Sequence, residues 1–258
     1  MGYPLLDLSG KTAVVIGGTS GIGLTLSRGL AEAGADVVPT GRREDLVRAS
    51  AKQVESTGKR SLVRTCDVTD TSSVERFKDE VLAEFGSVQI LVNCAGRTKR
   101  MPTLDFPEKE WSEILDTNLN GTLRACKAFG RHMVEQGYGR IINIASLATF
   151  VAAYEVAAYS ASKAAVASLT KSLAIEWALR GVCVNAIAPG VFSTDLNAQI
   201  LDSTGRGREY LMRTPMQRFG RLEELIGAAV FLASDAASFV TGHILAVDGG
   251  FLASGVNQ

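Results

Sequence analysis

A tyrosine and a lysine four residues apart, Tyr159 and Lys163, could together move a proton. Residues 156–179 show a helical pattern of apolar side chains, so both groups should leave one face of the same helix. A phenol has a pKa near ~10 and is a weak acid or base at neutral pH unless a cation stabilises the phenolate. Lys163 is placed to be that cation. The same spacing also fits two residues on an ordinary helix surface, so other features must decide.

Two such features predict a ligand site. Ser146 follows the apolar run 140–145, and if that run is a strand of a parallel sheet, Ser146 lies at the carboxyl edge, where such sheets bind ligands. Residues 17–23, GGTSGIG, follow the first apolar run and lead into a helix. Glycines there let the backbone approach a diphosphate, whose charge the free N–H groups of a helix N-terminus can meet. Glycine-rich turns also serve packing, but this position favours a dinucleotide.

The elements that must position these residues alternate along the chain of 258 residues. Short apolar runs, each followed by a turn and a longer stretch of helical period, are typical of a parallel sheet with crossover helices. We expect one domain over 1–258, an α/β doubly wound seven-stranded parallel sheet with helices on both faces. The predicted strands are Thr12–Ile16, Asp36–Pro39, Ser61–Cys66, Val88–Val92, Arg140–Ala145, Val182–Ile187 and His243–Val247, and the predicted helices are Gly21–Glu32, Glu44–Ser56, Thr71–Phe85, Pro107–Glu135, Val156–Leu179 and Glu223–Ala233.

The segment 189–220 departs from this alternation. It is too polar and glycine-rich for a core strand and too long for an ordinary connection. We expect a loop with short helices that covers a ligand site as a substrate lid, although an idle surface insertion would have the same composition.

Composition excludes several classes of function. Lys+Arg and Asp+Glu both number 27, and no basic block is present, so nucleic acid is not expected as the main partner. No apolar run is long enough to predict a membrane span. The four cysteines are widely spaced and the two histidines are too few for common zinc sites, so we expect no metal and reduced thiols in a cytoplasmic protein.

Several motifs in this order resemble those of the short-chain dehydrogenase/reductase family, from about Leu8 to Gly250. They are Gly18-x-x-Gly21-x-Gly23, Asn93-Cys94-Ala95-Gly96, Asn118, Ser146, Tyr159-x-x-x-Lys163 and Pro189-Gly190. The resemblance implies a Rossmann fold that binds NAD(H) or NADP(H). It also implies hydride transfer to or from a carbonyl or secondary alcohol of a small-molecule substrate, and commonly a homotetramer.

By the same resemblance, Tyr159 is the general acid/base, Ser146 orients and polarises the substrate oxygen, and Asn118 anchors a proton-relay water. Lys163 would lower the pKa of Tyr159 and hold the nicotinamide ribose. Asp67 could equally be a neighbour of a helix N-cap. The implied cofactor contacts are Gly18, Ser20, Gly21, Ile22 and Gly23 in the glycine loop, Asp67 and Val68 at the adenine, Asn93, Ala95 and Gly96 along the adenosine ribose, Tyr159 and Lys163, and Pro189, Gly190, Phe192 and Thr194 at the carboxamide.

Two residues depart from the family pattern. Gly17 stands where the family usually has threonine, and Cys94 stands where a second asparagine is frequent. The missing threonine hydroxyl removes a bond between the glycine loop and the Asn93 region, so we expect a looser turn.

The end of the second predicted strand bears on the choice of cofactor. NAD-binding folds usually place an acidic residue there, which bonds the ribose hydroxyls and repels a 2′-phosphate. Here Gly41 takes that place and Arg42 and Arg43 follow, which favours NADP(H). Ser20 stands where some NADP-preferring relatives carry a basic residue, so NAD(H) remains possible.

The tail from Thr214 to Gly250 looks most like gluconate 5-dehydrogenase-type members of the family. This likeness and the polar lid favour a sugar acid or polyol as substrate, and for an acid Arg97, Arg100 and Arg206 are candidates to bind its carboxylate. The alternative within the family is a 3-oxoacyl-carrier-protein reductase. A non-catalytic dinucleotide-binding module is a weaker alternative, because such a module need not keep both Tyr159 and Lys163.

Overall fold

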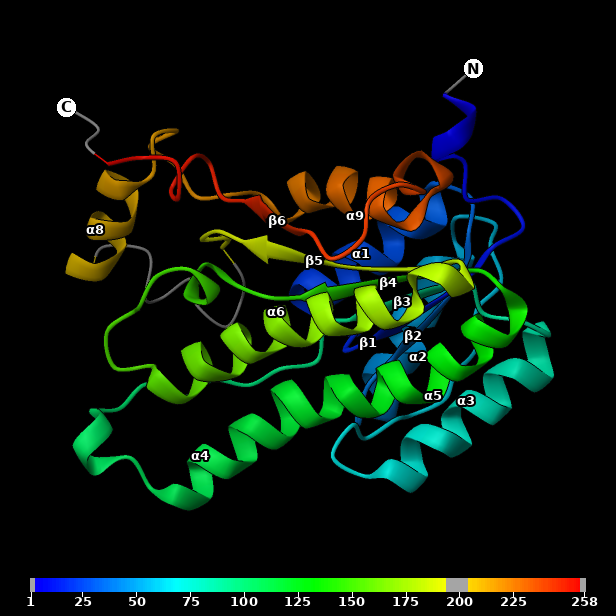
Figure 1. Cartoon of the computed structure of the whole chain (residues 1–258), viewed down its shortest axis with the longest axis horizontal. Coiled ribbons are helices and arrows are strands. Elements are labelled where there is room, and N and C mark those ends of the chain that lie inside the picture. The colour runs from blue at the N-terminus through cyan, green and yellow to red at the C-terminus, as the bar shows by residue number, and fades with distance from the viewer. Residues whose placement is uncertain (1–2, 194–203, 256–258) are drawn as a thin grey trace.

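The computed structural model describes residues 3–193 and 204–255, so Thr194 lies outside the described residues. These fold around a single parallel sheet of six strands in the order β2-β1-β3-β4-β5-β6 (Figure 1). Parallel pairing on both sides explains why the inner strands read as continuous apolar runs. The strands are β1 Thr12–Ile16, β2 Asp36–Thr40, β3 Ile90–Asn93, β4 Gly139–Ile144, β5 Val182–Pro189 and β6 Ile244–Val247.

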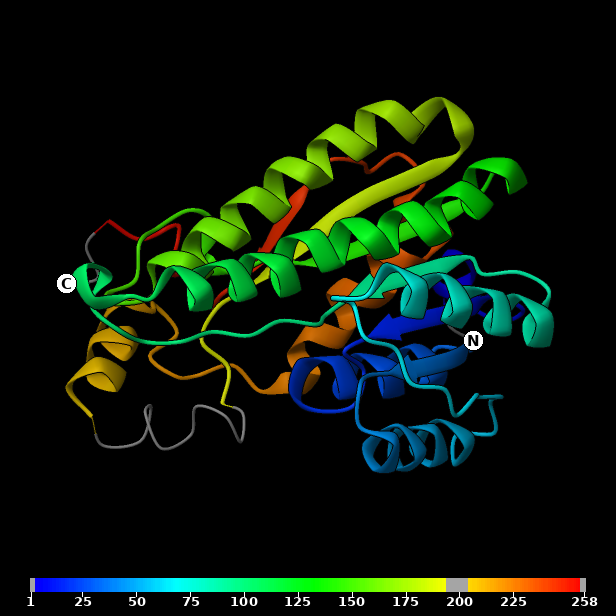
Figure 2. The same ribbon diagram turned by 90° about the horizontal axis from the view of Figure 1, so that it is seen from below.

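Helices cover both faces of the sheet, and each face has its own apolar core (Figure 2). The helices α1 Gly21–Glu32, α2 Glu44–Glu55 and α9 Ile226–Ala233 lie on one face. On the other lie α3 Thr71–Phe85, α5 Gly121–Gln136 and α6 Ala157–Trp177. The described residues also form α4 Glu108–Leu115 and α8 Gly205–Arg213, with a π-helical turn at Asp116–Asn120 and 3₁₀ turns at Pro4–Leu6, Thr103–Asp105, Leu147–Thr149, Ala178–Arg180, Leu222–Leu225 and Asp235–Ala237.

The sheet of the described residues has six strands and not the predicted seven, because Ser61–Cys66 does not form a strand. The segment lies beside β2, but its backbone–backbone bonds there are at its ends, where Val37 N–H donates to Arg60 O and Cys66 N–H donates to Gly41 O. Between them, a side chain of β2 makes a bond, from Thr40 Oγ1 to Arg64 O (2.7 Å). Pro39 explains the gap, because alternate residues of a strand donate to the same side and Pro39 has no N–H to give. A regular ladder therefore does not form at this edge.

The predicted helix Pro107–Glu135 is also interrupted. The π-helical turn at 116–120 separates α4 from α5 and places Asn118 at its centre, fully buried. Such turns often mark functional sites. Within 189–220, the structure describes the short helix α8, in keeping with the expected loop with short helices.

The described residues form neither a membrane-spanning helix nor a cluster of metal ligands. No helix in this part of the chain is long and apolar enough to cross a membrane. Nor do any three or more histidine, cysteine, aspartate or glutamate side chains gather there as a possible metal site.

Candidate active site

Ser146, Tyr159 and Lys163 come together at the carboxyl edge of the sheet. Ser146 follows β4 and begins the 3₁₀ turn 147–149, where its Oγ accepts a hydrogen bond from Ala148 N–H (3.1 Å). Tyr159 lies in the first turn of α6, and Lys163 lies one turn later. The fold therefore brings the predicted catalytic residues from two elements into one place.

Lys163 is held by the sheet itself. Its side chain is buried, and Nζ donates to the carbonyl oxygen of Ile144 (2.6 Å) at the end of β4. Nζ also lies 5.7 Å from the centre of the Tyr159 ring. Burial lowers the pKa of Lys163 to about 8, so the ammonium form still predominates at pH 7.

The pKa of Tyr159 is raised above its usual value. Burial is the main cause, and negative charge on Cys94 or Tyr210 would add to it, whereas the Ser146 hydroxyl acts in the opposite direction. Desolvation of the phenolate is thus the largest influence on this pKa. The lowering by Lys163 that the family resemblance implies stays a prediction.

The side-chain amide of Asn118 is bonded to two segments of the protein. Its Oδ1 accepts from Arg97 N–H (2.8 Å), and its Nδ2 donates to Arg97 O (2.9 Å) and to Ser162 Oγ (2.9 Å). These bonds fix the segment after β3 against α6. The anchoring of a proton-relay water by Asn118 stays a prediction.

The glycine loop after β1 fits a diphosphate. Ser20 is the N-cap of α1, and its side chain makes no capping bond, so the first N–H groups of the helix are not blocked by it. A Cβ at Gly23 would collide with Gly17 O, and one at Gly18 would lie 2.8 Å from Val15 O. The backbone is thus packed too tightly for side chains, which leaves main-chain groups to face a ligand.

Gly17 has a backbone conformation that suits glycine. Its φ is +79°, and a Cβ there would lie 2.5 Å from Ala95 N, so threonine does not fit this conformation. The N–H groups of Gly17 and Gly18 both donate to Thr40 O (2.9 and 3.0 Å), which ties the loop to the end of β2. The looser turn toward the Asn93 region stays a prediction.

Known proteins share this sequence and this arrangement. The family model described as enoyl-(acyl carrier protein) reductase matches residues 17–252. A 2-dehydro-3-deoxy-D-gluconate 5-dehydrogenase of Bacillus subtilis is 45% identical over 98% of this chain and 99% of its own. A D-threitol dehydrogenase of Mycolicibacterium smegmatis is 41% identical over 95% of this chain and 94% of its own.

A solved structure agrees with both. It is a gluconate 5-dehydrogenase from Burkholderia cenocepacia in complex with NADP and tartrate, with a TM-score of 0.92, 40% identity, and coverage of 97% of this chain and 98% of that one. The chain belongs to the short-chain dehydrogenase/reductase family. It is therefore an NAD(P)-dependent oxidoreductase with a Rossmann-like fold.

On the adenine side of this dehydrogenase's cofactor site, one of the residues predicted to contact the cofactor is already bonded within the protein, and others are exposed. Asp67 Oδ1 accepts from the N–H (2.9 Å) and hydroxyl (2.7 Å) of Thr69, so this carboxylate holds a local turn, while Asp70 is the N-cap of α3. Val68 is buried. Arg42 and Arg43 are exposed before α2, and neither side chain has a hydrogen bond or ion pair within the described ranges 3–193 and 204–255.

At the end of β3, the motif 93–96 can meet a cofactor through its main chain but not through the side chain of Asn93. Asn93 is buried and donates to Asn143 Oδ1 (2.9 Å), so its side chain joins β3 to β4. A Cβ at Gly96 would lie 3.7 Å from Lys163 Nζ, which places this backbone directly beside the catalytic lysine. Main-chain atoms of 95–96 are therefore the groups of this motif that can meet a cofactor.

The segment after β5 is anchored to β6. Gly190 N–H donates to Val247 O (2.8 Å), and a Cβ at Gly190 would lie 2.6 Å from Asp248 Cα, so only glycine fits. The ring of Phe192 is buried against Gly220. Phe192 can thus face the nicotinamide only through its backbone.

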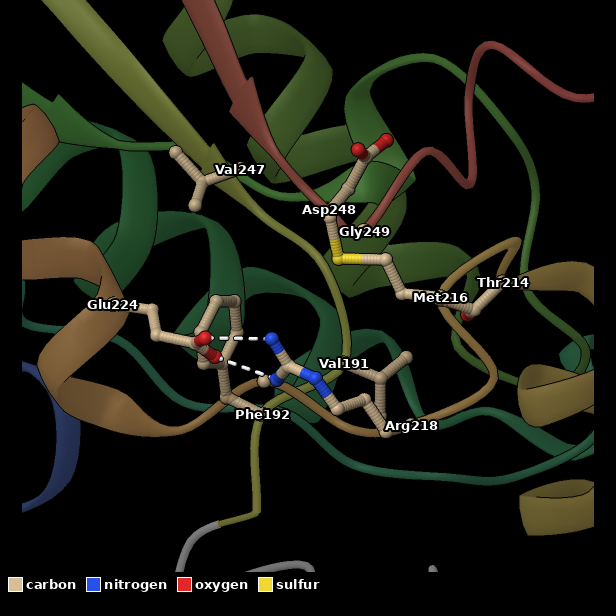
Figure 3. Close-up of a pocket in the computed structure, with 10 residues that line it drawn as sticks. Val191, Phe192, Thr214, Met216, Arg218, Glu224, Val247, Asp248 and Gly249 are labelled. Atoms are coloured by element: carbon tan, nitrogen blue, oxygen red, sulfur yellow. Dashed lines mark hydrogen bonds and ion pairs between the residues drawn. The ribbon is translucent and has the colours of Figure 1, made fainter.

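Beside this segment lies a pocket that sequence reasoning did not find (Figure 3). Arg218 closes one side of it with a bidentate ion pair to Glu224 (2.6 and 2.8 Å). The pair neutralises both charges, so the pocket offers no free charge from them. The lining residues are Val191, Phe192, Thr214, Met216, Arg218, Gly220, Glu224, Val247, Asp248 and Gly249.

Tyr210 of α8 is the residue near the catalytic centre that the sequence analysis missed. It is an electrostatic neighbour of Tyr159. No spacing rule connects position 210 to position 159, because the contact depends on how α8 folds back over the sheet edge.

Proposed function

We propose that this protein is a cytoplasmic, NADP(H)-preferring dehydrogenase that oxidises a secondary alcohol of a sugar acid or polyol, or reduces the matching ketone. The observation that carries the proposal is that Ser146, Tyr159 and Lys163 lie together at the carboxyl edge of the sheet. The glycine loop after β1 is packed too tightly for side chains, so it can bind a ligand there only through its own backbone. The names of the relatives support the substrate class, since they act on dehydro-deoxy-gluconate, threitol and gluconate. We infer one domain over 1–258, with 189–220 as its substrate lid.

In this mechanism, the bound nicotinamide supplies the hydride or accepts it. When a ketone is reduced, hydride adds to the carbonyl carbon and Tyr159 donates its proton to the oxygen, which becomes the alcohol. Ser146 holds that oxygen by a hydrogen bond and polarises it. Lys163 compensates the phenolate that remains on Tyr159, because its ammonium lies above the same ring. Oxidation runs these steps in reverse.

The preference for NADP(H) follows from charge at the end of β2. Gly41 removes the acidic residue that would repel a 2′-phosphate, and Arg42 and Arg43 have no acidic partner in the part of the chain that the structure describes. The solved Burkholderia relative carries NADP. NAD(H) would still fit the site, but without the pairing to phosphate.

The test is a substrate panel with both cofactors. We expect D-gluconate, 2-dehydro-3-deoxy-D-gluconate or D-threitol to change NADP(H) absorbance with a higher kcat/KM than acetoacetyl thioesters. A faster thioester would instead support a 3-oxoacyl-carrier-protein reductase. NADPH binding without turnover of any compound would make the protein a non-catalytic dinucleotide-binding module.

We also infer a homotetramer. Large apolar side chains are exposed on the outside of the monomer, among them Ile175 and Leu179 one turn apart at the end of α6, and Phe239. Burying such groups against another copy is favourable. Light scattering should give four times the chain mass of 27.4 kDa, and a single-chain mass would contradict the inference.

A further inference from the structure

Two of the three arginines expected near the substrate are already neutralised. Arg97 pairs with Glu113 (2.6 Å) and Glu110 (3.0 Å). Arg100 pairs through Nε with Glu155 (2.8 Å). A guanidinium that already has a carboxylate partner gains little from a second one, because the first has met its charge and several of its donors.

The Arg100 pair also has a structural task. Glu155 has a φ of +63°, which is strained for a residue with a side chain. Its backbone carbonyl accepts from Met101 N–H (2.9 Å), so main chain and side chain both join 100–101 to the segment before α6. Arg100 is therefore committed to holding this segment.

Arg206 differs from both. Its Nη1 donates to Tyr154 O (3.1 Å) and its Nη2 to Tyr210 OH (3.2 Å), and the guanidinium carbon lies 5.6 Å from the centre of the Tyr210 ring. All of these partners are neutral. No carboxylate pairs with Arg206 anywhere in residues 3–193 or 204–255, and Glu209 on the same helix pairs with Arg213 instead. Among the described residues, its positive charge is held in place by neutral groups and has no carboxylate partner.

The position of Arg206 relates it to the catalytic tyrosine by two routes. Tyr154 immediately precedes Glu155 in the segment that leads into α6, whose first turn carries Tyr159. Tyr210 is an electrostatic neighbour of Tyr159 and packs against Phe251, with ring centres 6.3 Å apart. The helix α8 lies beyond the carboxyl ends of the strands, on the same side as the beginning of α6 (Figures 1 and 2).

We propose that Arg206 binds the carboxylate of the substrate, while Tyr159 acts on a hydroxyl further along the same molecule. The inference rests on the proposed function and narrows it to sugar acids rather than polyols. A planar guanidinium matches a carboxylate with two parallel hydrogen bonds, and within residues 3–193 and 204–255 the donors not used on Tyr154 and Tyr210 have no other partner. Because Tyr154 O and Tyr210 OH already orient the group, little conformational entropy is lost on binding.

The test compares an acid with its neutral amide. Calorimetric titration of the NADPH-loaded protein with D-gluconate and D-gluconamide measures the preference for the charged group without turnover, because the reduced cofactor cannot accept a hydride from the alcohol. In Arg206→Gln we expect affinity for the acid to fall on the order of 10- to 100-fold, and affinity for the amide to change by less than about threefold. Arg206→Lys should keep part of the preference, as a point charge without the planar fork.

Arg208→Gln is the matched control, since Arg208 is an exposed arginine on the same helix. It should bind both ligands as the wild type does. Equal affinity of the wild type for acid and amide, or an equal loss of both in Arg206→Gln, overturns the inference and leaves Arg206 a merely structural residue. Turnover measured in parallel distinguishes a failure of this inference from a failure of the proposed function. If the wild type prefers the acid through Arg206 but oxidises no sugar acid, the proposed function fails while the carboxylate site stands.

Discussion

Lys163 is a buried cation for which the described residues provide a carbonyl oxygen, Ile144 O, but no carboxylate. Burial therefore lowers its pKa from 10.5 to about 8, and at pH 7 the folded protein must keep an ammonium that water would solvate better. A shift of this size corresponds to roughly 3 kcal/mol of lost stability. The residue is retained at a cost to the fold, as expected of a group that serves the reaction.

Lys163→Met should consequently stabilise the protein and inactivate it. At pH 7 we expect a gain of about 1–3 kcal/mol, reduced by the lost bond to Ile144 O. Between pH 8 and 10.5 the unfolded wild type binds more protons than the folded one, so wild-type stability rises with pH and the advantage of the variant shrinks. Urea unfolding at pH 7 and pH 10 measures this. A variant less stable than the wild type at pH 7 would show that Lys163 stabilises the fold.

Arg42 should determine the choice of cofactor. Arg42→Ala is expected to lower kcat/KM with NADP by roughly 10- to 100-fold, since it removes a charge-assisted contact to the 2′-phosphate. The value with NAD should stay within about twofold. Arg48→Ala is the control, because Arg48 is exposed on α2, the helix that follows Arg42, but is paired with Glu44. An equal loss with both cofactors would place Arg42 away from the phosphate.

At the scale of elements, the glycine loop depends on contacts between backbones. Gly23→Ala should abolish NADPH binding, because its Cβ would collide with Gly17 O and push the loop out of the conformation that faces a diphosphate. Gly227→Ala is the matched change, since Gly227 is also helical but has open space around it. There we expect unchanged binding and about 0.5–1 kcal/mol of added stability. Fluorescence titration with NADPH and urea unfolding check both, and wild-type affinity in Gly23→Ala would contradict the packing argument.

Element boundaries were predictable where the chain marks both ends. The helix Thr71–Phe85 was predicted to the residue, because Asp70 caps its beginning and Gly86, with a φ of +77°, ends it. Asn118 gave no such signal. The π-helical turn around it keeps the apolar pattern of a continuous helix, and the bonds to Arg97 and Ser162 that accompany it come from distant parts of the sequence.

The same distinction applies to the site. Tyr159 and Lys163 could be found because one helix carries both, and Ser146 because it ends a strand. The family resemblance then gave each a role. Arg206 and Tyr210 could not be ranked from the sequence, because their value depends on which charges the folded chain has already neutralised.

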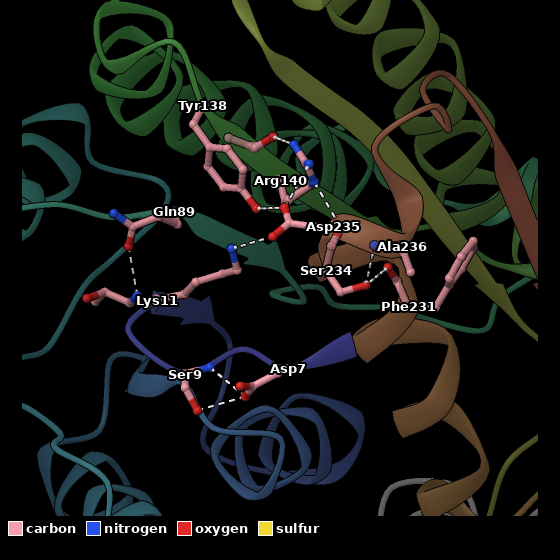
Figure 4. Close-up of polar contacts among 12 residues, drawn as sticks. Asp7, Ser9, Lys11, Gln89, Tyr138, Arg140, Phe231, Ser234, Asp235 and Ala236 are labelled. Atoms are coloured by element: carbon pink, nitrogen blue, oxygen red, sulfur yellow. Dashed lines mark hydrogen bonds and ion pairs between the residues drawn. The ribbon is translucent and has the colours of Figure 1, made fainter. Parts of the chain in front are cut away.

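At the scale of the whole molecule, one cluster joins distant segments at the amino edge of the sheet, opposite the active site (Figure 4). Asp235 accepts from Tyr138 OH (2.7 Å) and pairs with Lys11 (3.1 Å) and Arg140 (3.4 Å). These residues precede β1, flank the beginning of β4 and follow α9. Arg140 is only 4% exposed, so its charge depends on this carboxylate.

Asp235→Asn should destabilise the protein by about 1–3 kcal/mol at pH 7, because it leaves Arg140 buried without a counter-charge. Burial raises the pKa of Asp235, but the bonds from Tyr138 and Lys11 outweigh it and hold the pKa below its usual range. The stabilisation is therefore present above about pH 4 and is lost as the pH falls through the native pKa, so the difference between wild type and variant should narrow toward pH 3. Urea unfolding at both pH values tests this, and kcat should not change. A difference that stays constant down to pH 3 would exclude the carboxylate charge as its cause.

The role of Tyr159 is the centre of this account, and Tyr159→Phe tests it most directly. The variant keeps the half-buried ring but removes the oxygen that exchanges the proton. The measurement is kcat, followed by NADP(H) absorbance with the best substrate of the panel, together with the Kd for NADPH. We predict that kcat falls on the order of 10²- to 10⁴-fold while the Kd stays within a few-fold of the wild type. A variant that retains more than about a tenth of wild-type kcat would contradict the assignment of Tyr159 as the acid and base.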